Sequence, residues 1–157
     1  MKNQKSLQET YAPNSTCFGC GPKNKHGLRI QSYVEGNLVV AQWDPNPNYH
    51  GFPNMLSGGI ISTLMDCHSN WAATYHLMKQ LGMMRPMETV TAAFFVKFNR
   101  PTPTDKPLRM EARITESDDQ HATVETNLIS GGKITATFKG TFVAVKPHHP
   151  AFGKWNE

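Results

Sequence analysis

The sequence lacks any apolar run long enough to cross a membrane, and its opening MKNQKSLQETYAPNS lacks the apolar stretch of a secretory signal. We therefore expect no membrane segment and no export. Cysteine is scarce and odd in number, at three, which makes no disulfide framework and indicates the reducing cytoplasm. Internal repeats and linkers are also missing, so residues 1–157 are expected to form one domain.

Positive charge is in excess, but clusters of it are missing. The net charge of +4 suits an anionic partner, either nucleic acid or a phosphorylated small molecule. The Lys and Arg residues are scattered, with no run interleaved with aromatic residues, which argues against nucleic acid. Apolar residues make up 38% of the chain, with eight Met and eight Phe, so a folded core is expected and a disordered chain is not.

Sequence periodicity and turn residues divide the chain into elements. Residues 1–16 are polar and are expected to form a loose arm, and the turn-rich residues 17–27 a flap or loop. Residues 44–54 hold three prolines and predict a loop, ordered or mobile. A helix is predicted over 57–78, ending near Gly82. Strands are predicted at 28–34, 38–43, 90–98, 108–114, 121–129 and 134–145.

The helical segment SGGIISTLMDCHSNWAATYHLM has one formally charged residue, Asp66, where a surface helix normally carries several. At about 100° per residue, its apolar stripe contains Ile60, Ile61, Leu64, Met65, His68, Trp71, Ala72 and Tyr75. The opposite side is small and polar, and contains Gly59, Ser62, Asp66, Asn70 and Ala73. We expect this helix to be buried on nearly all sides, by a wrapped sheet and by a subunit partner or substrate.

The strands after the helix follow a period of two. Strict alternation places Val90, Ala92, Phe94, Val96 and Phe98 on one face of their strand. Hairpin-length turns, including GGK at 131–133, link the last three strands, so that part of the sheet should be antiparallel. The fold class is therefore α+β. A curved antiparallel sheet of about six strands around one long central helix is the hot-dog architecture.

Three segments resemble sequence patterns of the hot-dog acyl-CoA thioesterases of the phenylacetate-pathway type. They are CFGCGPKNKHGLRI, HGFPNMLSGGIISTLMD and VTAAFFVKFNRP, in the family order and with similar spacing. With the strands around them they cover about residues 17 to 145. The resemblance implies hydrolysis of an acyl-CoA or acyl-carrier thioester without a metal or other cofactor. It also implies a site formed between the subunits of a homodimer or tetramer.

The glycine-rich start of the helix and its lone carboxylate give the expected catalytic residues. Ser57 at the helix start is expected to cap it, leaving the backbone N–H groups of Gly58 and Gly59 as an oxyanion hole. By the resemblance, Asp66 is the general base or nucleophile, and Thr91, supplied by the neighbouring subunit, helps to position the attacking water. The alternative for Asp66 is an ordinary exposed helix residue.

One position departs from the family. Many relatives have His-Gly-Gly where this chain has Ser57 before the glycines. His50 or His68 is a candidate to replace that histidine in orienting the thioester, although His68 lies on the apolar stripe, where a hydrogen-bonded core histidine is the common outcome. Asn48 or Asn54 is expected to supply the amide contact that relatives make to the thioester.

Further substrate contacts are expected from polar residues near the helix and after the first long strand. Asn70 belongs to the small polar face of the helix. Asn99 and Arg100, with Lys97 and Lys139, are candidates to meet the phosphates of coenzyme A, and solvated surface residues are the alternative.

The cysteines suggest a second kind of site. Cys17-x-x-Cys20-Gly is similar to half of a zinc knuckle, to which His26 would add a ligand. No second pair follows and Cys67 falls in the helix, so a four-ligand site within one chain is incomplete. We expect a flap turn with unmetallated thiols, and a Cys67 that is a small buried apolar residue and not a nucleophile.

Three functions remain open from the sequence. The first is a thioesterase, and the second is a silent hot-dog protein that binds acyl-CoA without cleaving it, which the missing histidine favours. The third is an enoyl-CoA hydratase, although the Asp-Cys-His spacing does not fit one. The acyl group is not given by the sequence. Trp71, Tyr75, Phe52 and the Met-rich residues 78–87 suggest an apolar or aromatic chain, and core packing is the alternative.

Overall fold

The computed structural model describes residues 3–156, and it contains the predicted helix and all six predicted strands. The first strand is shorter than predicted and begins at Ser32. The proline-rich loop is ordered, with one short 3-10 helix and a small hairpin. The elements are α1 Leu7–Tyr11, β1 Ser32–Glu35, β2 Leu38–Trp43, η1 Pro47–Tyr49, β3 His50–Phe52, β4 Met55–Leu56, α2 Gly58–Gln80, β5 Thr89–Phe98, β6 Leu108–Ser117, β7 His121–Ser130, β8 Lys133–Ala144 and η2 Lys154–Asn156.

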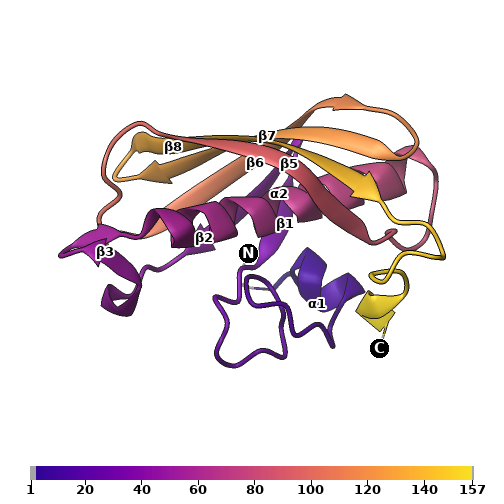
Figure 1. The fold of residues 1–157 in the computed structure, drawn as a ribbon, viewed down its shortest axis with the longest axis horizontal. Helices are drawn as coiled ribbons and strands as arrows, with labels where there is room; N and C mark the ends of the chain where they lie inside the picture. The colour runs from indigo at the N-terminus through magenta and orange to yellow at the C-terminus, as the bar shows by residue number, and fades with distance from the viewer. Residues whose placement is uncertain (1–2, 157) are drawn as a thin grey trace.

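Six strands form one sheet in the order β1-β2-β6-β7-β8-β5, and every neighbouring pair is antiparallel. Short turns join β6, β7 and β8, as predicted, and the turn at Gly131 and Gly132 needs the positive φ values that glycine adopts without strain. The long helix α2 runs across one face of this sheet (Figure 1). The predicted arrangement of a sheet around one central helix is therefore confirmed.

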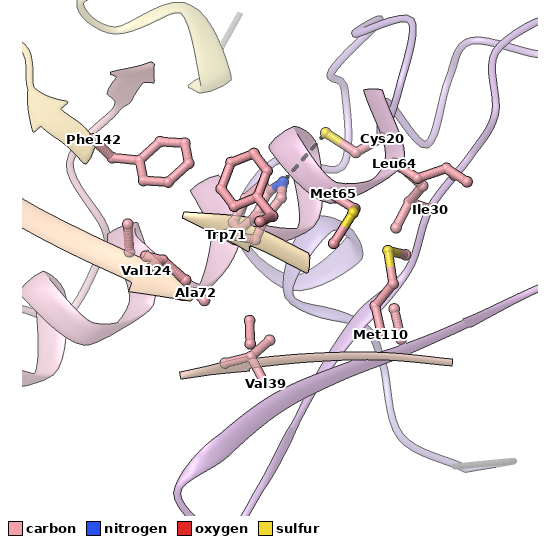
Figure 2. Close-up of a cluster of buried hydrophobic side chains, with 14 of the residues drawn as sticks. Cys20, Ile30, Val39, Leu64, Met65, Trp71, Ala72, Met110, Val124 and Phe142 are labelled. Atoms are coloured by element: carbon pink, nitrogen blue, oxygen red, sulfur yellow. Dashed lines mark hydrogen bonds between the residues drawn. The ribbon is translucent and has the colours of Figure 1, made fainter. Parts of the chain in front are cut away.

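The main core lies between α2 and the sheet. Alternate residues of β7 and of most of β8 point towards the helix and are buried, which gives the period of two that the sequence showed. Figure 2 shows side chains from both layers meeting in this space. Its contributors include Leu64 and Met65 from the helix and Val39, Met110, Val124 and Phe142 from the strands.

The side of α2 that faces away from the sheet is covered by both ends of the same chain (Figure 1). The prediction of a loose arm is wrong for residues 6–12, because α1 carries a capping box and packs its apolar side inward. The buried Gln8 side chain also bonds to both the amide and the hydroxyl of Ser32. At the other end, Trp155 stacks on Trp71 with ring centroids 4.6 Å apart.

Strand β5 is an edge of the sheet and hydrogen-bonds to β8 on one side. Unlike β7 and β8, it is mostly exposed, and its aromatic side chains are the clearest case. Phe94 is 45% exposed, Phe95 71% and Phe98 52%. An apolar, exposed edge strand is a surface on which another strand can pair. Within residues 3–156, none of the helices is long and apolar enough to span a bilayer.

Candidate active site

The carboxylate of Asp66 lies where α2 passes the start of β5. Asp66 is half-buried, and its Oδ1 accepts a hydrogen bond of 2.7 Å from the hydroxyl Oγ1 of Thr91. This contact, which the sequence did not predict, forms within one chain. Thr91 thus reaches Asp66 of its own chain, whereas it was expected to reach the site from the neighbouring subunit, and its contact with the attacking water stays a prediction.

A β-bulge in β5 explains how Thr91 reaches Asp66. The register shifts between Thr91 and Ala93, so strict alternation ends there. Thr91 lies opposite the buried Phe142, whereas Phe94 lies opposite Gly140 two positions along the same face of β8. The predicted face that joined Val90 and Ala92 to Phe94 is therefore wrong. The inserted residue turns Thr91 towards the helix.

Burial sets the electrostatics of this carboxylate. Desolvation raises the pKa of Asp66 above its usual value, the hydrogen bond from Thr91 partly opposes the rise, and negative charge on the nearby Cys17 would add to it. A carboxylate with a raised pKa is a better proton acceptor than an exposed one, provided that it remains ionised at the working pH. The physical state of Asp66 thus suits a general base.

The start of α2 carries two exposed glycines, Gly58 and Gly59. Ser57 occupies the N-cap position, but its side chain makes no capping hydrogen bond, so the predicted cap is wrong. Its hydroxyl lies to one side instead, 3.7 Å from the point where Gly59 would carry a Cβ. The first N–H groups of a helix have no partner within the helix. Those of Gly58 and Gly59 therefore remain available to an anionic ligand atom.

A hollow of about 380 Å³ adjoins this helix start and is mainly apolar. It is lined by Phe52 of β3, by Gly58 and by Phe98 of β5, whose ring would lie 3.3 Å from a Cβ on Gly58. Arg100, one of the predicted phosphate contacts, also lines it. The backbone amides of Asn99 and Arg100 both donate to the carbonyl of Thr135, which fixes this end of β5.

The other polar candidates in the proline-rich region stand apart from Asp66. Asn48 lies in η1 and His50 in β3, and both are exposed. Asn54 forms the turn between β3 and β4 with a φ of 65°, a conformation that asparagine tolerates better than most residues. The structure brings these residues near the helix start, and not beside the carboxylate.

His68 and Asn70 serve the fold. His68 is fully buried, with Nδ1 2.9 Å from the hydroxyl of Ser32 and Nε2 3.0 Å from the carbonyl of Val39, and burial lowers its pKa to about 4. The prediction that His68 contacts the substrate is therefore wrong. The amide of Asn70 bonds to both the carbonyl and the hydroxyl of Thr89, which ties α2 to β5.

Cys67, which the sequence placed apart on the helix, joins Cys17 and Cys20 in a cluster of thiols next to Asp66. The loop at residues 17–20 folds onto α2, and the sulfur atoms of Cys17, Cys20 and Cys67 lie within 4.8 Å of one another. Hydrogen bonds from Cys20 and Cys67 lower the pKa of Cys17. The hydrogen bond between Cys17 and Cys20 raises the pKa of Cys20. A single thiolate at Cys17 is thus favoured by its neighbours.

Solved structures of the same fold cover most of this chain. A thioesterase superfamily protein from Shewanella loihica PV-4 is 25% identical, with a TM-score of 0.69 over 88% of this chain and 99% of that chain. The E. coli PaaI protein from the phenylacetic acid degradation operon is 16% identical, with a TM-score of 0.63 over 76% and 81%. A Streptococcus mutans protein bound to acetyl-CoA is 14% identical, with a TM-score of 0.62 over 74% and 88%.

No family model matches the chain, and no curated protein does. The structural likeness nevertheless confirms the predicted resemblance. The chain has the hot-dog fold of thioesterase superfamily proteins, including those related to phenylacetic acid degradation.

Proposed function

We propose that this protein hydrolyses an acyl-CoA or acyl-carrier thioester to a free acid and a thiol, with Asp66 as general base or nucleophile. One observation carries the proposal: a half-buried carboxylate of raised pKa, held by Thr91, on a helix that begins with two glycines. The likeness to thioesterase superfamily proteins supports it, as does a protein of this fold bound to acetyl-CoA. As the odd number of cysteines indicated, we place it in the reducing cytoplasm.

The reaction draws on groups that the chain itself supplies. In the general-base route, Asp66 accepts a proton from water while the water oxygen attacks the thioester carbonyl carbon. The carbonyl oxygen becomes an oxyanion that the N–H groups of Gly58 and Gly59 stabilise, and the C–S bond then breaks to release the thiolate. In the nucleophilic route, a carboxylate oxygen forms an anhydride that water hydrolyses. Neither route uses a metal or other cofactor.

One helix cannot supply both halves of this site to one thioester. Gly59 precedes Asp66 by seven positions, about 10 Å along the helix axis. The helix N–H groups point away from Asp66, towards the N-terminus, so a bound oxyanion lies further still. A base must approach its proton to about 3 Å, directly or through one water. We therefore propose that Asp66 and Thr91 of one protomer act with Gly58 and Gly59 of the partner subunit.

The edge strand β5 offers the surface for such a pair. Its exposed aromatic residues flank Thr91 and the helix start, and its free edge can pair with the β5 of a second copy. We propose a homodimer through β5, with a tetramer as a further assembly. The hollow beside the helix start would then hold an apolar or aromatic acyl chain. Trp71, which is buried in the core, takes no part in that contact.

The dimer is tested by placing a charge on β5. Phe95→Glu introduces a carboxylate on an exposed side chain that faces no core, so the protomer should fold while pairing weakens. Ile134→Glu is the matched control, because Ile134 is also exposed but lies on the interior strand β8. Light scattering should show a dimer or tetramer for the wild type and the control, and a monomer with little activity for Phe95→Glu. An active wild-type monomer of 17.6 kDa at micromolar concentration would refute the dimer.

Hydrolysis is tested with a panel of short, long and aromatic acyl-CoAs. Product CoA should be separated by chromatography, because the three free cysteines of the protein would react with a thiol reagent. Ser57 in place of the usual histidine favours a second candidate, a silent acyl-CoA-binding protein. Stoichiometric acyl-CoA binding with no release of CoA from any substrate would establish that candidate and reject the hydrolase.

A further inference from the structure

The three cysteines of the chain converge from segments far apart in the sequence. Cys17 and Cys20 lie on one tight turn, closed by a 2.9 Å hydrogen bond from the amide of Gly21 to the carbonyl of Cys17. Cys67 lies on α2, and its sulfur is 3.9 Å from that of Cys17. In residues 3–156, this is the only group of three or more Cys, His, Asp or Glu residues with ligand atoms close enough to hold a metal ion.

The sulfur spacing fits coordination to a common ion. Zinc–thiolate bonds are about 2.3 Å long, so two sulfurs on one tetrahedral zinc lie about 3.8 Å apart. The Cys17–Cys67 distance of 3.9 Å is close to that value, and all three sulfurs lie within 4.8 Å. A disulfide would instead need about 2.05 Å. One ion among the three sulfurs therefore requires only small shifts.

The surroundings are shaped to receive sulfur acceptors. The indole Nε1 of Trp71 donates to Cys20 Sγ at 3.3 Å (Figure 2). Indole N–H is a donor only, so this sulfur accepts, as metal-bound thiolates do from their outer shell. A Cβ on Gly19 would lie 2.3 Å from the sulfur of Cys67, and a Cβ on Gly21 2.4 Å from the backbone nitrogen of Cys17. Gly19 is therefore needed for the turn to lie against α2, and Gly21 for the turn to close on itself.

We propose that Cys17, Cys20 and Cys67 bind one thiophilic divalent cation of the zinc class, through three thiolates, with a fourth position open to a water molecule. Sulfur ligands select such soft or borderline cations over magnesium or calcium. Cys17 is exposed, which places the open position on the solvent side. Binding releases the thiol protons and ties the N-terminal segment to α2 beside Asp66. The site is complete in one chain and supplies no reacting group to the proposed hydrolysis.

The test is metal binding by tag-free, reduced protein. We expect about one equivalent of zinc by mass spectrometry after growth with zinc, and protection of the thiols from alkylation until a chelator is added. Titration of the apo-protein with Co²⁺ should give a near-ultraviolet thiolate-to-cobalt charge-transfer band. Cys17→Ser should lose the band and yet fold, because Cys17 is exposed. Cys67→Ser should lose it as well, and circular dichroism establishes that each variant is folded.

His26→Ala is the matched control, since His26 lies in the same loop and is exposed. It should keep the metal and the charge-transfer band. Loss of metal from His26→Ala would overturn the three-sulfur assignment, and so would unchanged binding by Cys17→Ser. Three freely alkylated thiols with no cobalt band, or a disulfide whose reduction restores no metal affinity, would also overturn it. These readouts do not involve thioester hydrolysis, so they stand apart from the proposed activity.

Discussion

His68 and Asp66 lie two positions apart on α2, and their hydrogen-bonding groups are satisfied to different extents. On one side His68 is fully buried and each ring nitrogen has a partner, Ser32 or Val39. On the other, Asp66 is half-buried and accepts a hydrogen bond from Thr91. An ionised carboxylate offers about four lone-pair positions, so Asp66 retains capacity that His68 has used.

Burial favours the neutral form of both side chains, but with different consequences. It lowers the pKa of His68 to about 4, and neutral imidazole is the form that the core holds. It raises the pKa of Asp66, whose proposed role needs the charged form. A polar group that serves the fold is thus satisfied in its favoured state. A polar group that serves chemistry must instead work in the charged form that burial disfavours. Four substitutions test this contrast.

Asp66→Asn should have the largest effect. The amide keeps the shape and can still bond to Thr91, but it cannot accept a proton or attack, so turnover should fall on the order of 100- to 10,000-fold. Acyl-CoA binding should persist. Stability should hold or rise at neutral pH, because a folded-state pKa above the unfolded value means that ionising Asp66 costs stability as pH rises. Steady-state kinetics and thermal melts measure both.

Asp118→Asn is the control for this change, because Asp118 is an exposed carboxylate at the β6–β7 turn. Its turnover should match the wild type. If Asp66→Asn kept more than half of the wild-type turnover on a clearly hydrolysed substrate, Asp66 would not be the base or nucleophile.

His68→Leu should give the opposite pattern, with stability lost and chemistry kept. The carbonyl of Val39 and the hydroxyl of Ser32 lose a partner in the core, at a cost on the order of 3 kcal/mol. The wild type should lose a similar amount of stability as pH falls from about 6.5 towards 4, because the folded state resists protonating His68. The variant should lack this acid-dependent part. Denaturant unfolding across that pH range measures it, and a collapse of turnover in folded His68→Leu would contradict it.

The helix and the strands were predictable because their signals are local. The missing charge on α2 and the alternation of β6, β7 and β8 each report burial directly, and the structure buries those faces. The Gly-Gly pair and the isolated Asp66 could be picked out for the same reason. A core histidine on the apolar stripe was also visible as the alternative for His68.

The remaining features depend on tertiary contacts that no local pattern encodes. One extra residue in β5 reverses the face of Thr91, and the sequence gives no sign of the bulge. The arm that looked polar is held by the buried side chain of Gln8. Cys67 meets Cys17 only because a loop 50 residues away folds onto the helix.

Thr91→Val should change the pH profile of activity. Removing the hydroxyl removes the hydrogen bond that lowers the pKa of Asp66, so that pKa should rise further and the acid limb of kcat/KM should move to higher pH. Hydrogen bonds to charged groups are worth about 1.5 kcal/mol or more, so on the acid limb, where less Asp66 is ionised, kcat/KM should fall roughly 10-fold. Thr91→Ser keeps the hydroxyl and should keep the wild-type limb. An unmoved limb in Thr91→Val would show that the contact does not tune Asp66.

Ser57→Ala should have the smallest effect, and its size decides what the serine does. A capping serine is worth about 1 kcal/mol, but the Ser57 side chain makes no capping bond, so stability should change by less than about 0.5 kcal/mol. A larger loss in thermal melts would show that the hydroxyl caps the helix in solution. A fall in kcat/KM without loss of stability would instead give Ser57 the orienting role that histidine has in relatives. Ser57→His completes the comparison: if that role is vacant, the imidazole beside Gly58 and Gly59 should raise kcat/KM while the dimer and the melting temperature stay unchanged.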